Sequence, residues 1–500
     1  MTAATTGAAI MIVEILGAKM LAPYFGTSHF VWTAQIGVTL LALASGYYFG
    51  GWLADRSAWP ARLYCCIGLA AAYLGVTVVS CQPVAYACLQ MNLALGSIAT
   101  SLALFFIPLT LLATTGPFLA RLLTSSVEKV GGQVGRLTAI STLGSVVGTG
   151  LIGYALLPLL PNSYTMAATA ALLAAMVAAY FAAFGKKAPA KVAILVLMSA
   201  GLVVSGLSLF HRSDESDARL EELYSGNSHF GRLQVMRDVG SGRLRYLNDF
   251  LTQNTYDPAR KQSTSMFTFM LHELAGAYCP SISNVLCIGL GMGIVPMQFA
   301  RDGAQVDVVE INPSIVPLAV RYFDLEPARL HVVFGDGRYF LNATKRQYDA
   351  LILDAFLGDS SPSHLMTREA FAAMQRVLRP GGVLVINSFG AFEPGRDFFS
   401  ASLERTLQAV FKRVRIHAAA SGNTFYVASD NPDLAPIREP DLKQIHPTCQ
   451  RGVRDAFASV MSFPPDRGRV LTDDFNPVEF YDAANREWLR RQLALDMRAF

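Results

Sequence analysis

Residues 285–293 read VLCIGLGMG, and this stretch decides the fold. Its first four residues are apolar, as is typical of a buried strand in a parallel sheet. Gly289, Gly291 and Gly293 follow at alternate positions, where residues without a β-carbon let the backbone turn sharply and approach a ligand closely. A strand that ends in such a turn is typical of an open α/β sheet, whose ligands bind beyond the carboxyl ends of the strands.

Three more strand-like runs follow, and each leads into an acidic residue. The runs and the residues after them are 306–309 with Glu310, 331–334 with Asp336 and Gly337, and 350–353 with Asp354. We predict that these groups share one cleft, in which Glu310 accepts hydrogen bonds from a ribose diol and Asp336 accepts from an adenine amino group. The third glycine of a dinucleotide-binding G-x-G-x-x-G would fall on Ile294. The pattern therefore favours an adenosyl-sulfonium nucleoside over a dinucleotide.

The composition divides the chain into two parts. Apolar residues make up 52% of the 500 residues and charged residues 16%, which is low for a soluble protein. Residues 1–210 hold nine Lys and Arg side chains but three acidic ones, a balance of +6 that leaves −2 for the rest of a chain with a net charge of +4. No basic stripe occurs in the second part, so we expect no nucleic-acid partner.

The first part is expected to cross a lipid bilayer, which takes about 20 apolar residues per helix. Segments of about that length lie at 4–21, 31–53, 63–91, 97–121, 134–157, 162–184 and 190–210. We predict about seven transmembrane helices in residues 1–211. The pairs Gly46/Gly50 and Gly144/Gly148 permit close helix contact, and Pro108 and Pro117 are expected to kink the helix that contains them.

The seven cysteines show no C-x-x-C spacing, and four of them lie in the apolar helices. Such cysteines are usually small buried side chains. We predict neither a metal site nor a disulfide framework.

The second part is predicted to begin with a charged linker or short helix at 212–223 and a β-hairpin formed by 230–236 and 244–248. Further helices are predicted near 264–278, 313–322, 365–377 and 397–410, with strands at 383–387, 413–418 and 424–428. The fold class is an α-helical multi-span membrane domain followed by an α/β Rossmann-like domain of the class I methyltransferase type, with a small N-terminal β-hairpin region. The predicted divisions are 1–211 for the membrane domain, 212–255 for the linker and hairpin, 256–430 for the Rossmann-like domain, and 431–500 for a tail packing on it.

With these residues in place, the chain resembles the polyamine aminopropyltransferases, the spermidine synthase family, and in particular the bacterial subset with a membrane domain fused ahead of the enzyme domain. The resemblance covers most of the chain. The motifs that carry it lie at 248–253, 288–293, 309–312, 335–338 and 348–355 in the second part, with 14–26, 50–56 and 472–479 resembling the fused subset.

The resemblance implies transfer of an aminopropyl group from decarboxylated S-adenosylmethionine to a diamine or polyamine, without a metal. It implies that Asp354 is the catalytic aspartate. The residues it assigns to the donor nucleoside are Gly289, Gly291, Gly293, Glu310, Asp336, Gly337 and Gln253. The candidate residues for the amine substrate are Asp249, Asp359, Asp473 and Asp474.

Three positions depart from the family pattern. An aspartate that binds the donor's amine in soluble members is Met292 here, a second aspartate after the fourth strand is Leu357, and a tyrosine of the substrate site is Phe269. These departures leave two alternatives open. One is methyl transfer from S-adenosylmethionine on the same scaffold. The other is a non-catalytic transporter or sensor that binds nucleoside or polyamine. It is favoured by residues 50–56, which resemble the loop after the second helix of major-facilitator transporters, and by the intramembrane residues Glu14 and Lys19.

The sidedness of the membrane part can be argued in two ways. Basic residues at 56–62, 121–136 and 186–191 place those loops in the cytoplasm, and seven spans would then put the second part on the opposite side. A domain that uses a cytosolic nucleoside should face the cytoplasm. We therefore expect a multi-pass protein of the bacterial inner membrane with a cytoplasmic catalytic domain. The number of spans should then differ by one from the seven counted above. Tethering and homodimer formation are the simplest uses of the membrane part.

Overall fold

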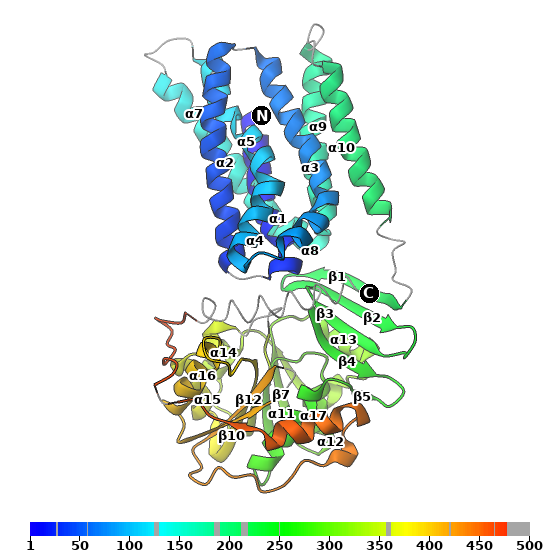
Figure 1. Ribbon diagram of the computed structural model, residues 1–500, viewed down its shortest axis with the longest axis vertical. Helices are drawn as coiled ribbons and strands as arrows, with labels where there is room; N and C mark the ends of the chain where they lie inside the picture. Colours follow the sequence, from blue (N-terminus) through cyan, green and yellow to red (C-terminus); the bar gives the residue numbers. More distant parts are fainter. Residues whose placement is uncertain are drawn as a thin grey trace. The chain divides into compact units, whose positions relative to one another are not determined.

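The chain divides into two compact units, residues 1–216 and 217–500, in a computed structural model (Figure 1). The structure describes residues 1–26, 29–57, 59–124, 130–184, 191–211, 219–249, 251–356, 362–419, 422–464 and 466–477. Each unit is described by itself.

The first unit is entirely helical over its described residues. Its helices are α1 (Thr2–Phe25), α2 (His29–Arg56), α3 (Pro60–Cys88), α4 (Leu93–Ser101), the π-helix η1 (Leu102–Phe106), α5 (Ile107–Ala113), α6 (Thr115–Leu123), α7 (Val130–Leu151), the π-helix η3 (Ile152–Leu156), α8 (Leu157–Leu159), α9 (Asn162–Phe184) and α10 (Lys191–His211). Six continuous helical segments among the described residues are long and apolar enough to cross a membrane: α1, α2, α3, Leu93–Leu123, Val130–Leu159 and α9. The apolar segment found in α10, Val192–Leu207, is shorter. The structure thus gives six such helices where the sequence predicts about seven.

Small residues allow these helices to pack closely, as predicted. A β-carbon added at Gly144 or Gly148 of α7 would overlap the backbone of Ala4 or Ala8 in α1. Gly50 of α2 lies in the same way against the backbone of Thr114. Contacts this close bring the helix backbones together, which favours association inside a bilayer. The helical segment 93–123 is π-helical over Leu102–Phe106, just before Pro108, and is interrupted by a turn at Thr114, three residues before Pro117. Glu14 and Lys19 lie half-buried on α1.

The second unit begins with a five-stranded antiparallel sheet. Its strands, in spatial order, are β1 (Leu220–Ser228), β2 (Gly231–Asp238), β3 (Leu244–Asn248), β4 (Leu251–Asp257) and β5 (Gln262–Ser263). The predicted hairpin is confirmed as β2 and β3, which pair antiparallel. The assignment of a linker or helix up to residue 223 is wrong from Leu220 onward, because cross-strand pairing with β2 places that charged segment in β1.

A mixed eight-stranded sheet forms the centre of the second unit. In spatial order it contains β13 (Val460–Met461), β11 (Arg413–Ala418), β12 (Asn423–Ser429), β10 (Leu378–Phe389), β9 (Tyr348–Leu353), β6 (Asn284–Ile288), β7 (Gln305–Glu310) and β8 (His331–Phe334). The neighbours from β10 to β8 are parallel, and β12 and β11 continue the sheet antiparallel. The four predicted strands that lead to glycines and acids are therefore adjacent, with their carboxyl ends at one edge.

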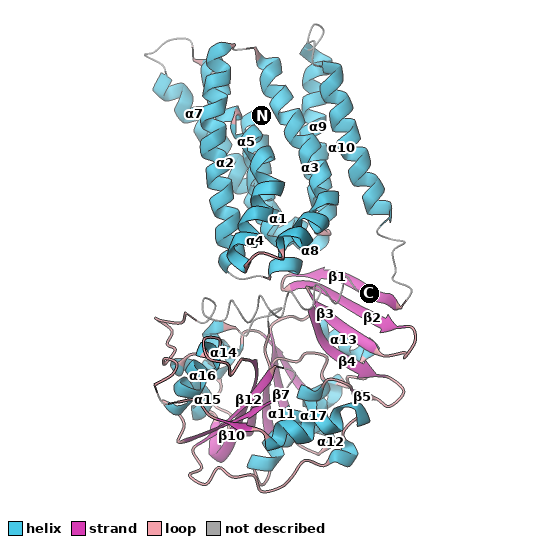
Figure 2. Cartoon of the chain, viewed as in Figure 1, coloured by secondary structure: helices cyan, strands magenta, loops and turns pink. Residues whose placement is uncertain are grey.

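Helices cover both faces of this sheet (Figure 2). They are α11 (Met266–Tyr278), α12 (Ile294–Arg301), α13 (Ile315–Tyr322), α14 (Gly337–Ala343), α15 (Arg368–Arg376), α16 (Phe398–Gln408) and α17 (Pro447–Ala458), with the short 3₁₀ turns η4 (Pro327–Arg329), η5 (Ser363–Leu365) and η6 (Leu442–Gln444). Alternate strand residues point to opposite faces. Val285 and Cys287 thus join a core with α11, α12, α13 and α17, whereas Leu286 and Ile288 join one with α14, α15 and α16. Both faces are buried, which explains the continuous apolar runs in the sequence.

Candidate active site

A cavity of about 300 Å³ lies at the carboxyl ends of the parallel strands. The polar residues of its wall are Asn248, Thr252, Gln253, Asn254, Ser265, Glu310, Asp336, Asp354, His364, Asn387 and Asn423. Its apolar wall is formed by residues such as Tyr246, Phe267, Ile288, Val309, Ile315, Phe356, Leu365 and Phe389. A mainly apolar cavity with a few converging polar groups is typical of a small-molecule site. Of the predicted site residues, the structure places Gln253, Gly289, Gly291, Glu310, Asp336, Gly337 and Asp354 in this wall.

The glycine turn is built so that no side chain fills the space beside β9. Gly289, Gly291 and Gly293 have φ values of +98°, +53° and +77°, which side-chain-bearing residues rarely adopt. A β-carbon at Gly289 would overlap the carbonyl oxygen of Asp354, and the Asp354 N–H donates to Ile288. The backbone of Asp354, the proposed catalytic residue, therefore packs directly against the glycine turn.

Gly293 is not in the cavity wall, contrary to its assignment to the donor nucleoside. It is the N-cap of α12, and a β-carbon there would overlap the side chain of Leu325. Its left-handed conformation serves the junction of the turn with the helix. Met292, between the last two glycines, is also directed away from the cavity, into the core beneath the turn.

Glu310 is buried at the end of β7, and each of its carboxylate oxygens already accepts one hydrogen bond. Oε2 accepts the N–H of Leu290 at 2.8 Å, and Oε1 accepts the N–H of Asn312 at 2.8 Å. Burial nevertheless raises the pKa of Glu310 above its ordinary value. Each carboxylate oxygen has a second lone pair, so Glu310 can still accept hydrogen bonds from a diol in the cavity while it holds the glycine turn.

Asp336 follows β8 and is the N-cap of α14. Its Oδ1 accepts the N–H of Tyr339 at 3.0 Å, and its Oδ2 accepts from Nε2 of His364 at 2.9 Å. Burial acts to raise the pKa of Asp336, but the hydrogen bonds from Tyr339 and His364 lower it below its usual range. Asp336 is therefore an ionised acceptor at the cavity rim, and His364 is a second polar group beside it that the sequence did not single out.

We expect Asp336→Ala to weaken nucleoside binding by about 1.5–3 kcal/mol, the usual contribution of a hydrogen bond to a charged group. The same change should lower the unfolding free energy by about 1 kcal/mol, because it removes an N-cap. Asp336→Asn keeps a capping oxygen and should retain stability while losing part of the affinity. Calorimetry with an adenosine nucleoside and thermal unfolding measure the two effects. Unchanged affinity in the alanine variant would contradict a role in base recognition.

Asp354 lies at the end of β9 and keeps part of its surface open to the cavity. Its Oδ1 accepts a hydrogen bond from Nδ2 of Asn387 at 2.9 Å. The surrounding protein raises its pKa to about 6 by desolvation, against the lowering effect of Asn387. A carboxylate with a pKa near that of imidazole can both attract a cation and accept a proton near neutral pH.

The β3–β4 connection forms the opposite wall. Gln253 and Asn254 of β4 line the cavity together with Asn248 of β3. Asp249, predicted to bind substrate, does not line it: its φ is +45° and its Oδ1 accepts the N–H of Arg232 at 2.9 Å. Asp249 is thus a turn residue that ties the end of β3 to the start of β2.

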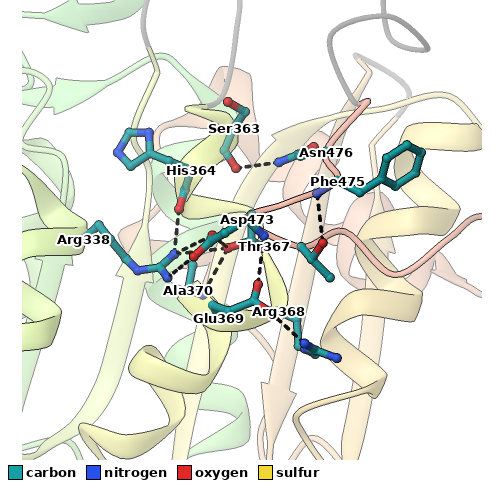
Figure 3. A network of polar contacts seen from close by, with 11 residues as sticks. Arg338, Ser363, His364, Thr367, Arg368, Glu369, Ala370, Asp473, Phe475 and Asn476 are labelled. Atoms are coloured by element: carbon teal, nitrogen blue, oxygen red, sulfur yellow. Dashed lines mark hydrogen bonds and ion pairs between the residues drawn. The ribbon is translucent and has the colours of Figure 1, made fainter.

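The described acidic residues of the C-terminal tail, Asp473 and Asp474, also lie outside the cavity wall, and Asp473 instead belongs to a network of polar contacts (Figure 3). Asp473 accepts from Nη2 of Arg338 at 2.8 Å and from the hydroxyl of Thr367 at 2.6 Å. Its carboxylate fastens the tail to α14 and the start of α15 and does not line the cavity, so the structure lends no support to its assignment to substrate. Asp474 is exposed and likewise absent from the wall.

Asp359 and Leu357 lie outside the described residues. Phe269 is buried in the core and lines a second cavity, so the position that carries a tyrosine in the family does not face this site. Among the residues that the structure describes, no group of three or more His, Cys, Asp and Glu side chains is arranged to hold a metal ion.

Three further residues of the wall, His364, Asn387 and Asn423, were not among the predicted site residues. Asn387 ends a predicted strand and could have been found by the rule that the carboxyl ends of parallel strands meet. His364 follows β9 by eleven residues, and Asn423 opens an antiparallel strand, so no spacing indicated that either would reach the cavity.

A family profile described as "Spermine/spermidine synthase domain" matches residues 265–421. The chain is 38% identical over 231 residues to a polyamine aminopropyltransferase from Vibrio vulnificus, an alignment that covers 42% of this chain and 74% of that protein. It is 32% identical over 145 residues to an N-terminal histidine N-methyltransferase from Emericella nidulans, covering 28% of this chain and 25% of the other. A crystal structure of spermidine synthase from Thermotoga maritima aligns with 20% identity and a TM-score of 0.38, over 49% of this chain and 84% of the other.

Proposed function

Because the chain belongs to the spermidine synthase family of polyamine aminopropyltransferases, and is accordingly a transferase, we propose that it moves an aminopropyl group from decarboxylated S-adenosylmethionine to a diamine or longer polyamine. The observation that carries this proposal is the position of Asp354: a desolvated carboxylate, with a pKa raised to about 6, faces a cavity whose other carboxylates suit a nucleoside.

In the proposed reaction, an amine nitrogen of the acceptor attacks the aminopropyl carbon bonded to the sulfonium. The C–N bond forms as the C–S bond breaks, and its electron pair goes to sulfur, so methylthioadenosine leaves as a neutral thioether. The nitrogen must lose one proton, and Asp354 accepts it. The protein therefore contributes mainly alignment and a base.

For the donor, we propose that the unused lone pairs of Glu310 accept from the ribose hydroxyls and that Asp336 accepts from the adenine amino group. Gly289 and Gly291 allow the nucleoside to approach the backbone, and Gln253 faces it from β4. This assignment is supported by the cavity wall, in which these residues occur together.

We propose that the enzyme is a multi-pass protein of the bacterial inner membrane with its second unit in the cytoplasm. If the six long apolar segments cross and α10 does not, the basic clusters at 56–62, 121–136 and 186–191 and the second unit all fall on the same side. The positive-inside argument and the cytosolic donor then agree. Labelling of single cysteines introduced within residues 125–129 and at residue 500, in intact cells against opened ones, tests whether the two positions share a side.

Methyl transfer from S-adenosylmethionine is the second candidate. It is favoured by Met292, because the glycine turn places that apolar side chain in the core and brings no acid into the cavity for a donor amine. The sequence similarity to a histidine N-methyltransferase is consistent with it.

We expect the purified full-length protein to convert decarboxylated S-adenosylmethionine and putrescine to methylthioadenosine and a longer polyamine. Intact S-adenosylmethionine should give no S-adenosylhomocysteine with the same acceptors. Mass spectrometry of both reactions distinguishes the products. S-adenosylhomocysteine as the only product would establish the methyl-transfer alternative, whereas ligand binding without any product would favour a transporter or sensor.

A further inference from the structure

Two asparagines connect Asp354 to the neighbouring strands of the sheet. Asn387 of β10 donates from Nδ2 to Oδ1 of Asp354 at 2.9 Å. Asn423, the first residue of β12, donates from Nδ2 to Oδ1 of Asn387 at 3.1 Å. The strands β12, β10 and β9 are consecutive in the sheet, and all three side chains line the cavity. The two amides and the carboxylate thus form a row across the strand ends.

We propose that Asn387 and Asn423 are positioning residues, which form a one-directional amide relay that keeps Asp354 ionised and turns its second oxygen, Oδ2, toward the acceptor amine. This inference rests on the proposed function and assigns a role to two residues outside the predicted site.

The direction of the relay matters because an amide has a donor end and an acceptor end of nearly the same shape. An ionised carboxylate only accepts, so it requires the NH₂ group of Asn387. If Asn387 turned over, its carbonyl oxygen would face Asp354 and favour the protonated acid. Asn423 prevents this by donating to the carbonyl oxygen of Asn387, which leaves the NH₂ group of Asn387 for Asp354. Asn423 therefore acts on Asp354 through Asn387.

Because the two amides are buried, their orientation has a large energetic effect. Asn387 and Asn423 are 2% and 9% exposed, so an unpartnered end of either amide would be costly. Desolvation raises the pKa of Asp354 and the Asn387 hydrogen bond lowers it. The rings of Phe356 and Phe389, whose centroids are 5.3 Å apart, line the same wall and reduce access of water to the carboxylate.

Other titratable groups also face this region. Cys287 lies on β6 and Tyr246 on β3, and burial raises the pKa of both, so they stay neutral. Glu310, Asp336 and His364 share the cavity wall. The pKa of Asp354 is nevertheless set by desolvation, which raises it, and by the hydrogen bond from Asn387, which lowers it. Among these groups, the amide relay is what opposes the rise.

The test uses Asn387→Leu, Asn423→Leu and the double variant in the full-length protein. The midpoint of the acid limb of kcat/KM should move up by about one pH unit in Asn387→Leu, because a donor to the charged carboxylate is lost. Asn423→Leu should move it in the same direction by less. The double variant should match Asn387→Leu alone, since Asn423 acts only through Asn387.

Two neighbouring substitutions serve as matched controls. Ser388→Ala and Thr424→Val alter the adjacent residues of β10 and β12, which are buried and do not line the cavity. Both should keep the wild-type midpoint. Alanine replaces leucine at 387 or 423 if thermal unfolding shows that a leucine variant does not fold. Additive shifts, or an unchanged midpoint in Asn387→Leu, would overturn the relay.

A second measurement separates this proposal from the reaction itself. The infrared band of the protonated Asp354 carboxyl, identified by its loss in Asp354→Asn, is followed against pH in each variant. If the wild type shows no turnover, the proposed function fails and the infrared midpoints still decide the relay. If the wild type turns over but the infrared midpoints coincide in all variants, the relay fails alone.

Discussion

Asp354→Asn is expected to remove turnover and to leave nucleoside binding intact. The amide oxygen can still accept the hydrogen bond from Asn387, so the cavity keeps its shape, but an amide cannot take the proton of the attacking amine. A general base contributes a factor of about 10²–10⁴ to a rate. We expect kcat to fall by that factor while the affinity for methylthioadenosine, measured by calorimetry, stays within about twofold of the wild type, far below the tenfold change that 1.4 kcal/mol would produce.

The same residue predicts the pH dependence of the wild-type enzyme. Its pKa is raised to about 6, and only the ionised form accepts a proton. Turnover should therefore rise with pH through a midpoint near pH 6. A midpoint near 4, the ordinary value for an aspartate, would show that Asp354 is not desolvated during catalysis.

Stability should change in the opposite direction to activity. The folded protein holds the Asp354 proton more tightly than the unfolded chain, so stability falls as pH rises from the unfolded pKa to about 6 and stays at the lower value above it. An asparagine does not titrate, so Asp354→Asn should be more stable than the wild type above pH 6. Loss of function with a gain of stability is the pattern expected of a functional residue held in an unfavourable site.

Asp349→Asn is a matched control at the other end of β9. The carboxylate of Asp349 accepts the N–H groups of Ser283 and Asn284 and pairs with Arg379. Although burial acts to raise its pKa, these contacts lower it, so its ionised form stabilises the fold above its pKa, and that stability is lost on acidification. The substitution should cost about 1–2 kcal/mol of stability and leave kcat unchanged. Equal losses of turnover in the two variants would contradict a chemical role for Asp354.

The sheet could be predicted because each parallel strand is buried on both faces. Continuous apolar runs such as 285–288 and 350–353 leave few alternatives when glycine or an acid follows directly. The same rule placed Glu310, Asp336 and Asp354 at one edge. The search for apolar runs did not find β1, because this segment is charged. Its strand conformation comes from pairing with β2 and cannot be recognised from its own residues.

Residues that reach the cavity from elsewhere were harder to predict. Asn423 lies on an antiparallel strand whose start, and not its end, faces the site. The acidic side chain of Asp473 suggests a cationic substrate, but Arg338, 135 residues earlier in the chain, pairs with it. Contacts over such sequence separations depend on the packing of the whole unit, which local spacing does not encode.

Glu310→Ala should cause the largest loss of nucleoside binding and a loss of stability together. The substitution leaves the N–H groups of Leu290 and Asn312 without the carboxylate that now accepts both. Each unsatisfied buried group costs about 1–3 kcal/mol, so the unfolding free energy should fall by about 2–6 kcal/mol. The nucleoside should lose its proposed ribose acceptor and meet a less ordered glycine turn, so its affinity should fall at least about 100-fold.

The two effects can be separated within β7. Glu310→Gln retains one accepting oxygen and should recover part of the stability but little of the affinity, because its NH₂ group faces a backbone donor. Asp307→Asn changes a buried carboxylate on the same strand that binds Tyr348 and Arg346 and does not line the cavity. It should lower stability without changing the dissociation constant. If Asp307→Asn weakened binding as much as Glu310→Ala did, the loss would come from a loosened sheet, and the assignment of Glu310 to the ribose would have to be abandoned.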